Sequence, residues 1–189
     1  LSDEVIEDVR AKLPELPDQK AERFAKDYKL GSYDANQLAN DSEVSSFFDE
    51  AMNDLNSDPK AAKTLANLLI NVLFAYLNSM EDLSVFDTHF TVKRAVCLTN
   101  SLEADEISKS HAKLVFDKII EEDKDPDVII EENGLKQVSD TGAIDAVIAE
   151  VLAESPDKVQ QYKAGKTGLL GFFMGQCMQK MKGQGNPAL

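Results

Sequence analysis

Three proline residues mark the starts of helices, and they constrain the fold of this chain more than any other feature. Each follows a short polar side chain that can cap a helix, in the pairs Asp58-Pro59, Asp125-Pro126 and Ser155-Pro156. Proline is favoured at the first helical position because its missing N–H needs no partner there, and the residue before it can accept hydrogen bonds from the first turn. The three pairs therefore predict helices that begin at residues 59, 126 and 156.

Apolar side chains recur at helical spacing along the whole chain, beginning with Val5, Ile6, Val9 and Leu13 after Ser2. The pattern predicts helices at about 2–13, 18–30, a short one before residue 41, one from 41 to about 52, 59–79, 91–101, 105–121, 126–133, 140–153, 156–164 and 167–182. The segment 59–79 is apolar nearly all round after Ala66, which is typical of the central helix of a bundle. No alternating strand pattern with an Asn-Gly or Asp-Gly turn occurs. The sequence thus predicts an all-α fold.

A polar and acidic stretch, NSLEADEIS at 100–108, separates two clearly periodic segments. The helices expected after it are shorter and could close as a bundle of their own. We therefore expect two consecutive helical bundles, a helical subdomain at 1–103 and a small tail subdomain at 104–189.

Composition excludes several classes of protein. The longest apolar run, LLINVLFAYL at 68–77, is about half as long as a bilayer span and contains Asn71. Cys97 and Cys177 are far apart and flanked by apolar residues, so we expect reduced thiols that act as small core residues. These features predict a cytoplasmic protein without a membrane segment.

Motifs that could carry catalysis are weak. AGKTG at 164–168 resembles the end of a phosphate-binding loop, but Gln160 stands where the first glycine of that motif belongs, so Gly165 is better read as the end of one helix and Thr167 as the cap of the next. His89 and His111 lack metal-ligand spacing, and the acidic clusters lack the pattern of a calcium loop. We predict no catalytic or metal site.

Charge is segregated along the chain. The formal net charge is −14, yet from Lys158 to the end there are five lysines and no Asp or Glu, which leaves −19 on residues 1–157. Such asymmetry points to an anionic partner for one end of the chain.

The helix expected from Thr167 combines an apolar face with repeated glycines. Its apolar residues, expected to be buried, are Leu169, Leu170, Phe173, Met174, Cys177, Met178 and Met181. Gly168, Gly171 and Gly175 recur along the same helix, and each costs about 1 kcal/mol relative to alanine. Something should therefore approach this helix closely, either a neighbouring helix or a sugar-phosphate backbone. The lysines around it lack acidic neighbours in the sequence, as a phosphate contact requires.

Six segments resemble, in order, the C-terminal part of the B subunit of the aspartyl/glutamyl-tRNA(Asn/Gln) amidotransferase, which includes the GatB/YqeY domain. They are LPELPDQKAERF, YDANQLA, KTLANLL, EISKSHAKLVFDKII, VIIEENGLKQVSD and VQQYKAGKTGLLGFFMGQCMQKMKGQGNP. The resemblance implies an all-helical linker bundle followed by a smaller YqeY-like tail. It also implies a part in the ATP-dependent transamidation of Glu-tRNA(Gln) or Asp-tRNA(Asn), a carbon-nitrogen ligase reaction in which glutamine donates the amide.

In this family the A subunit releases ammonia from glutamine, the C subunit clasps the pair, and an N-terminal body of the B subunit activates the aminoacyl-tRNA with ATP and Mg²⁺. The resemblance therefore implies that these 189 residues hold tRNA(Gln) or tRNA(Asn), carry no cofactor and are inactive alone. The tRNA-facing motif of the family falls on Lys163, Lys166, Gln176, Lys180, Lys182 and Asn186. We expect these residues to meet the outer corner of folded tRNA through its backbone. The alternative is a stand-alone helical adaptor whose glycine-bearing helix docks a protein.

Overall fold

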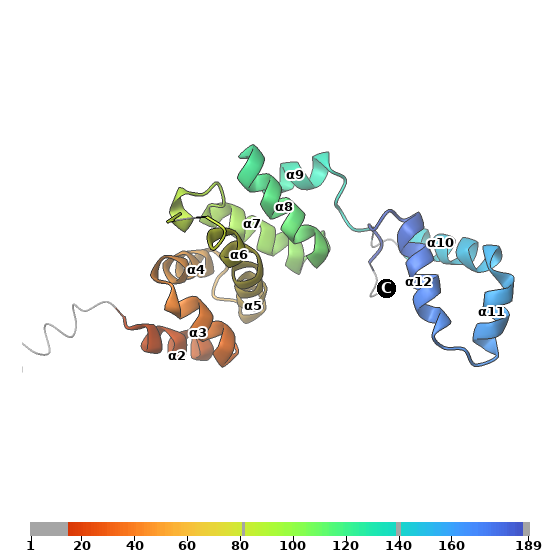
Figure 1. Ribbon diagram of the computed structural model, residues 1–189, viewed down its shortest axis with the longest axis horizontal. Helices are drawn as coiled ribbons and strands as arrows, with labels where there is room; N and C mark the ends of the chain where they lie inside the picture. The colour runs from red at the N-terminus through yellow and green to blue at the C-terminus, as the bar shows by residue number, and fades with distance from the viewer. Residues whose placement is uncertain (1–14, 81, 139–140, 187–189) are drawn as a thin grey trace, which may run out of the picture.

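The computed structural model describes residues 15–80, 82–138 and 141–186, which form two groups of helices in series (Figure 1). The first group contains α2 (Pro17–Asp27), α3 (Ser32–Asn40), α4 (Ser42–Asp54), α5 (Pro59–Leu68), η1 (Leu69–Leu73), α6 (Phe74–Leu77), η2 (Val85–Asp87), α7 (Val92–Glu103), α8 (Lys109–Glu122) and α9 (Pro126–Glu132). The second contains α10 (Thr141–Glu154), α11 (Pro156–Lys163) and α12 (Leu169–Lys180). The all-α prediction is confirmed. The helix expected at 2–13 lies outside the described residues.

The first group, here called the body, is organised around one buried core that runs from Ala21 in α2 to Leu135 after α9. Aromatic rings connect distant parts of it. The Phe47 and Phe90 rings lie 6.0 Å apart, and the Phe90 and Phe116 rings lie 4.9 Å apart in an edge-to-face arrangement. Edge-to-face pairs add to the stabilisation that comes from burying the rings. These contacts join α4 to α8 through the loop that holds Phe90.

All three prolines occupy the first turn of a helix as predicted, but only one of the preceding side chains caps its helix. The Asp58 carboxylate accepts a hydrogen bond from the Ala61 amide at 2.9 Å. Asp125 makes no cap and instead pairs with Arg94 of α7 at 2.8 Å. Ser155 makes no side-chain cap either. Proline geometry is a local property, whereas the partner of a capping carboxylate depends on what the fold brings near it.

The helix expected at 59–79 is present but is not regular. Its middle turn, η1, is a π-helix between α5 and α6. Leu65, Leu69 and Leu73 are fully buried, while Asn71 is exposed and donates its side-chain amide to the Asn67 carbonyl at 2.9 Å. One side of this helix therefore lines the core and the other meets solvent, rather than being enclosed all round.

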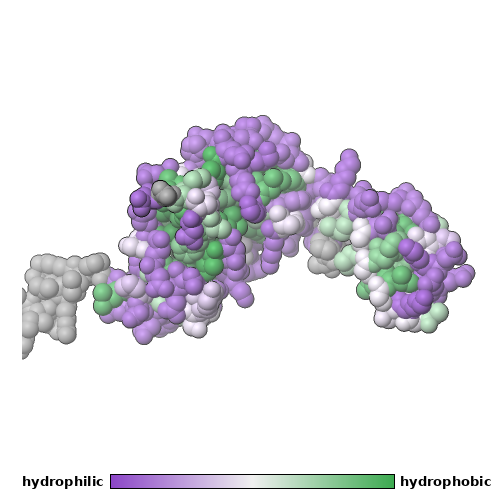
Figure 2. Space-filling view, viewed as in Figure 1, coloured by the Kyte–Doolittle hydropathy of each residue, from purple (hydrophilic) through white to green (hydrophobic). Residues whose placement is uncertain are grey.

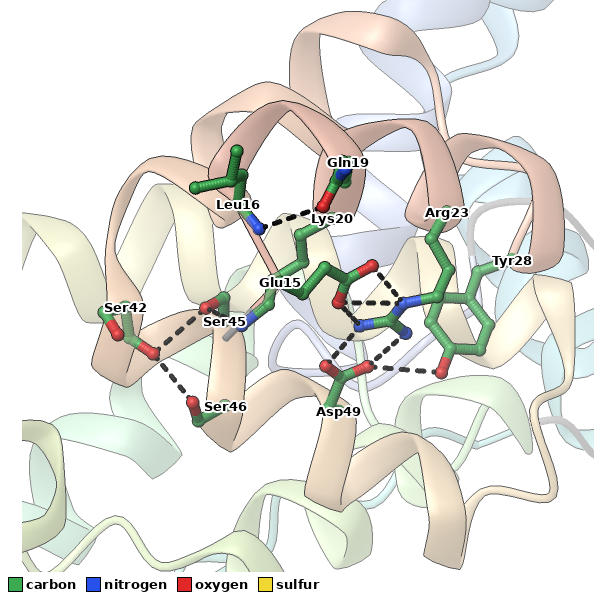
Figure 3. A network of polar contacts seen from close by, with 10 residues as sticks. All are labelled: Glu15, Leu16, Gln19, Lys20, Arg23, Tyr28, Ser42, Ser45, Ser46 and Asp49. Atoms are coloured by element: carbon green, nitrogen blue, oxygen red, sulfur yellow. Dashed lines mark hydrogen bonds and ion pairs between the residues drawn. The ribbon is translucent and has the colours of Figure 1, made fainter. Parts of the chain in front are cut away.

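An ion-pair cluster fastens α2 to α4 (Figure 3). The Arg23 guanidinium donates to both Asp49 carboxylate oxygens, at 2.8 and 2.7 Å, and to Glu15 at 2.8 to 3.2 Å. The hydrogen bonds to Asp49 and Glu15 raise the pKa of Arg23, and Arg23 lowers the pKa of Glu15. Paired donors that match a carboxylate fix geometry better than single contacts do. We call this cluster the Arg23 clasp.

The boundary expected between residues 103 and 104 falls in the turn between α7 and α8, where the buried core continues without a break. Ile107, Phe116 and Ile129, all beyond that boundary, belong to the core of the body. The division into folding units remains a prediction. From the packing we propose that the second unit, here called the tail, is α10 to α12.

Hydrogen bonds at one junction tie the tail to the body. The Gln184 side chain, beyond α12, donates to the Gly134 carbonyl, and the Val138 amide donates to the Gln184 carbonyl at 2.7 Å. Val138 and Gly185 form an isolated parallel bridge. Gly134 has a positive φ of 58°, which ends α9 and lets the chain turn toward this junction. The segment after α12 therefore returns to the point at which the tail begins.

Candidate nucleic-acid interface

Helix α12 lies between the residues that the sequence analysis selected, and two of the six, Gln176 and Lys180, are within it. It begins after Gly168 rather than at Thr167, and no side chain caps it, so the predicted cap at Thr167 is wrong. The Thr167 amide instead donates to the Gly165 carbonyl in the turn between α11 and α12. Gly165 ends α11 as predicted, with a φ of 104° that glycine adopts without strain.

The apolar face of α12 is not buried as predicted. Phe173 is 8% exposed, but Leu170 and Met174 are 55% and 46% exposed. This face forms one side of an open groove of about 390 Å³ between the three tail helices, to which Ile148 and Leu152 of α10 contribute. Hydrophobic residues are visible on the surface of the tail in Figure 2. Three short helices bury this face only in part.

The glycines of α12 lie on a different face from the groove. At 100° per residue, Gly168, Gly171 and Gly175 fall within about 60° of one another, and the centre of the apolar face is turned away from them. All three are exposed, and a methyl group added at any of them would meet no described atom within 4 Å. A neighbouring helix of the described chain therefore does not explain them. We call this surface the glycine face.

Lys163 is the last residue of α11, and Lys166 lies in the turn that leads to the N-terminal end of α12. Figure 1 shows this turn between the labelled helices α11 and α12. Both lysines are exposed. Lys166 donates to the side-chain oxygen of Gln161 at 3.1 Å, and neither lysine forms an ion pair within the described residues. Their positive charges are therefore not neutralised by a carboxylate of the described chain.

Lys180, at the C-terminal end of α12, has the acidic neighbours that the sequence analysis did not expect. Its ammonium group lies 2.7 Å from carboxylate oxygens of both Glu150 and Glu154 of α10. Hydrogen bonds to these two carboxylates raise the pKa of Lys180. The expectation of an acid-free environment is wrong for this residue, because α10 folds back alongside α12 and brings its carboxylates with it.

The remaining three selected residues lie along or just beyond α12. Lys182 is exposed, has a positive φ of 51°, and forms no ion pair within the described part of the chain. Gln176 is half-buried, and Asn186 lines the end of the apolar groove and makes polar contacts. Of the six selected residues, Lys163, Lys166 and Lys182 thus present cationic groups without a described carboxylate partner at the two ends of α12.

The charge balance is different when residues are grouped by the helices that pack together. Residues 141–186 carry five lysines and four carboxylates, a net charge of +1, whereas residues 1–140 carry −15. The tail is therefore close to neutral overall, with cations concentrated near α12. Sequence reasoning also gave no role to Lys158, whose ammonium group lies 3.3 Å from the centre of the Phe172 ring. This contact holds a further positive charge against α12.

Other candidate groups show no arrangement for chemistry. His89 contacts the Ile120 carbonyl at 2.9 Å, and Nδ1 of His111 is buried without a hydrogen-bond partner among the described residues. Both cysteines are free and half-buried, so neither is a fully buried core residue. Within residues 15–80, 82–138 and 141–186, no three His, Cys, Asp or Glu side chains are grouped to hold a metal ion. No helix in the described ranges is both long and apolar enough to cross a bilayer.

Comparison with known proteins places this arrangement in a family. A model of the GatB domain matches residues 46–189, which is well over half of the chain. The chain belongs to the GatB domain family. Its relatives include the B subunit of the aspartyl/glutamyl-tRNA(Asn/Gln) amidotransferase from Rickettsia rickettsii strain Sheila Smith, 42% identical over all 189 residues, and the corresponding protein of Persephonella marina, 40% identical over the same span.

This GatB chain spans 38% of the length of the Rickettsia rickettsii protein and 39% of the Persephonella marina protein. It corresponds to the C-terminal part of that protein, as the resemblance suggested. The GatB match begins inside α4, so the family model covers most of the body together with the entire tail. The lysines around α12 therefore belong to the part of the chain that the family model covers.

Proposed function

We propose that this GatB chain binds tRNA through the surface around α12. The observation that carries the proposal is the set of exposed lysines, Lys163, Lys166 and Lys182, at the two ends of a helix whose glycine face is open. The relatives are named for a tRNA amidotransferase, so a tRNA is the polyanion to which these lysines are matched. Lysine contacts to phosphate position a nucleic acid without reading its bases.

The spacing of these cations suits a folded nucleic acid. Helix α12 has 12 residues and is therefore about 18 Å long at 1.5 Å per residue. A ligand that touches both ends must span that distance and lie across the glycine face. Because glycine has no side chain, a sugar-phosphate backbone can come close to the helix there. Gln176 and Asn186 are the further residues that we assign to this surface.

In the complete amidotransferase this surface would hold the aminoacyl-tRNA, tRNA(Gln) or tRNA(Asn), during ATP-dependent transamidation with the A and C subunits in the cytoplasm. The chain itself would supply no catalytic group, and ATP and Mg²⁺ would bind to another part of the B subunit. A helical adaptor that docks a protein is the competing function, and the exposed apolar groove is the feature that favours it.

Binding of a folded tRNA transcript across salt concentrations separates the two functions. We expect affinity to fall steeply with salt, because each lysine-phosphate contact contributes about 0.7 to 0.9 to the slope of log K against log salt. The triple variant K163Q/K166Q/K182Q should lose about 2 to 3 units of slope by the same rule. The variant K26Q/K63Q/K93Q removes the same charge from exposed body lysines that form no ion pair within the described residues, and it is the matched control. Equal slopes in the two triple variants would contradict the proposal and favour the adaptor.

A further inference from the structure

Lys180 is the one tail lysine within the described residues that forms ion pairs, and its two partners bear on which RNA the tail binds. Glu150 and Glu154 are four residues apart on α10 and so project from the same side of that helix. Both carboxylates contact the one ammonium group, although they remain 59% and 56% exposed, and the Lys180 side chain is only 27% exposed. The cation is thus partly covered, while the two anions face solvent.

We propose that Glu150 and Glu154 withhold Lys180 from unstructured RNA and thereby contribute to a preference for folded tRNA. This inference rests on the proposed function. It adds that Glu150 and Glu154 are part of the recognition surface and act by repelling the phosphates of RNA. Binding proteins often obtain specificity by penalising the wrong ligand as well as by attracting the right one.

The physical basis is the position of the carboxylates relative to an approaching phosphate. A phosphate that reaches Lys180 must come close to two carboxylates that already lie 2.7 Å from the same nitrogen. A phosphate in contact with that nitrogen would lie within a few ångströms of both carboxylates, which is inside the Debye length of about 8 Å at physiological salt, so their repulsion of the phosphate is only partly screened. Lys180 therefore contributes little net attraction to an arriving polyanion.

Flexible and folded ligands differ in what they gain when this repulsion is removed. An unstructured strand binds through charge and can reach any accessible ammonium group. A folded tRNA presents phosphates at fixed positions, so its contacts are limited to lysines that match its shape. Releasing Lys180 consequently adds a full contact for the flexible strand and less for the folded one.

The test uses the variant E150Q/E154Q, which keeps the side-chain shapes and removes both charges. Affinities of the 189-residue chain for a folded tRNA transcript and for a single-stranded oligouridylate are measured by fluorescence anisotropy. The slope of log K against log salt for the oligouridylate should steepen by about 0.7, the value for one added single-strand phosphate contact. The ratio of the affinity for tRNA to the affinity for oligouridylate should fall about threefold to tenfold, because the oligouridylate gains one lysine-phosphate contact that the tRNA gains only in part.

Two further variants make the result specific. E121Q/E131Q changes net charge equally by altering exposed acids of α8 and α9 in the body, and should leave the ratio within about twofold if repulsion acts locally. Adding K180Q to E150Q/E154Q should abolish the steeper slope, whereas K180Q alone should change oligouridylate binding little. These outcomes assign the effect to Lys180.

An unchanged ratio in E150Q/E154Q, or the same change in E121Q/E131Q, overturns the inference. If the wild-type chain binds tRNA with a steep salt dependence but E150Q/E154Q has the same affinity ratio as wild type, the proposed function stands and only this inference is lost. If neither wild type nor E150Q/E154Q binds either RNA, both are lost.

Discussion

Replacing Arg23 by methionine should destabilise the body by about 2 kcal/mol, because a charged hydrogen bond contributes about 1.5 to 3 kcal/mol when buried and an exposed ion pair at most about 1. Arg23 contacts two carboxylates, and its own side chain is 30% exposed, while those of Glu15 and Asp49 are 32% and 28% exposed. Because the three side chains are about one-third exposed, we assign about 1 kcal/mol to each carboxylate, the upper value for an exposed ion pair. Methionine keeps most of the apolar length of the side chain, so little of the loss comes from packing.

Urea denaturation at pH 7, followed by circular dichroism, measures the loss. The control is K26M, which removes an exposed lysine from the same helix and should cost less than about 0.5 kcal/mol. In a double-mutant cycle with D49N, Arg23 and Asp49 should show a coupling free energy of about 1 kcal/mol. A coupling below about 0.3 kcal/mol, or equal losses in R23M and K26M, would refute the role of the Arg23 clasp.

The same clasp predicts a pH dependence. Arg23 lowers the pKa of Glu15 from its ordinary value of 4.5. A carboxyl group whose pKa is lowered by folding stabilises the fold above its ordinary pKa, and this stabilisation is lost as pH falls through the lowered value. The difference in unfolding free energy between wild type and R23M should therefore be constant above about pH 5.5 and shrink below about pH 4.5. A difference that stays the same down to about pH 3 would contradict this assignment.

Three further predictions concern the tail. K182Q should reduce the salt slope of tRNA binding by about 0.9, whereas K180Q should reduce it by less than half as much because two carboxylates already neutralise that lysine; equal effects would contradict the contrast. Q184A should speed hydrogen exchange at the Val138 amide about threefold to tenfold, as expected for loss of one hydrogen bond at the junction, with exchange in α8 as the unchanged reference. Limited proteolysis should cut first within 136–138, between α9 and α10, rather than in the turn between α7 and α8, where early cleavage would support the boundary predicted from sequence.

Features set by the local chain were predictable from the sequence. Proline fixes its own φ, so Pro59, Pro126 and Pro156 mark helix starts wherever the helices pack. Gly165 ends α11 for a similar reason, since its φ of 104° suits glycine. Helical periodicity likewise identified the all-α class. None of these inferences requires knowledge of which helices become neighbours.

Features set by distant partners were not predictable in the same way. Asp125 has the sequence position of a cap, but Arg94, 31 residues earlier, takes its carboxylate. The apolar pattern of α12 showed which face turns toward other helices, yet it could not show that Leu170 and Met174 would stay about half exposed. Periodicity gives the direction of burial, whereas the degree of burial depends on how many helices arrive to cover the face.

The same distinction governs the charge of the candidate interface. A stretch without Asp or Glu is free of carboxylates along the chain, but the electrostatic environment of a lysine is set by distance in space. Glu150 and Glu154 precede Lys180 by 30 and 26 residues and still lie 2.7 Å from it. Lys182, only two residues further on, has no such partner within the described residues. The positive charge available to a ligand therefore has to be assigned separately for each lysine. By that criterion we expect the attraction for RNA to come mainly from Lys163, Lys166 and Lys182, because two carboxylates of α10 neutralise Lys180.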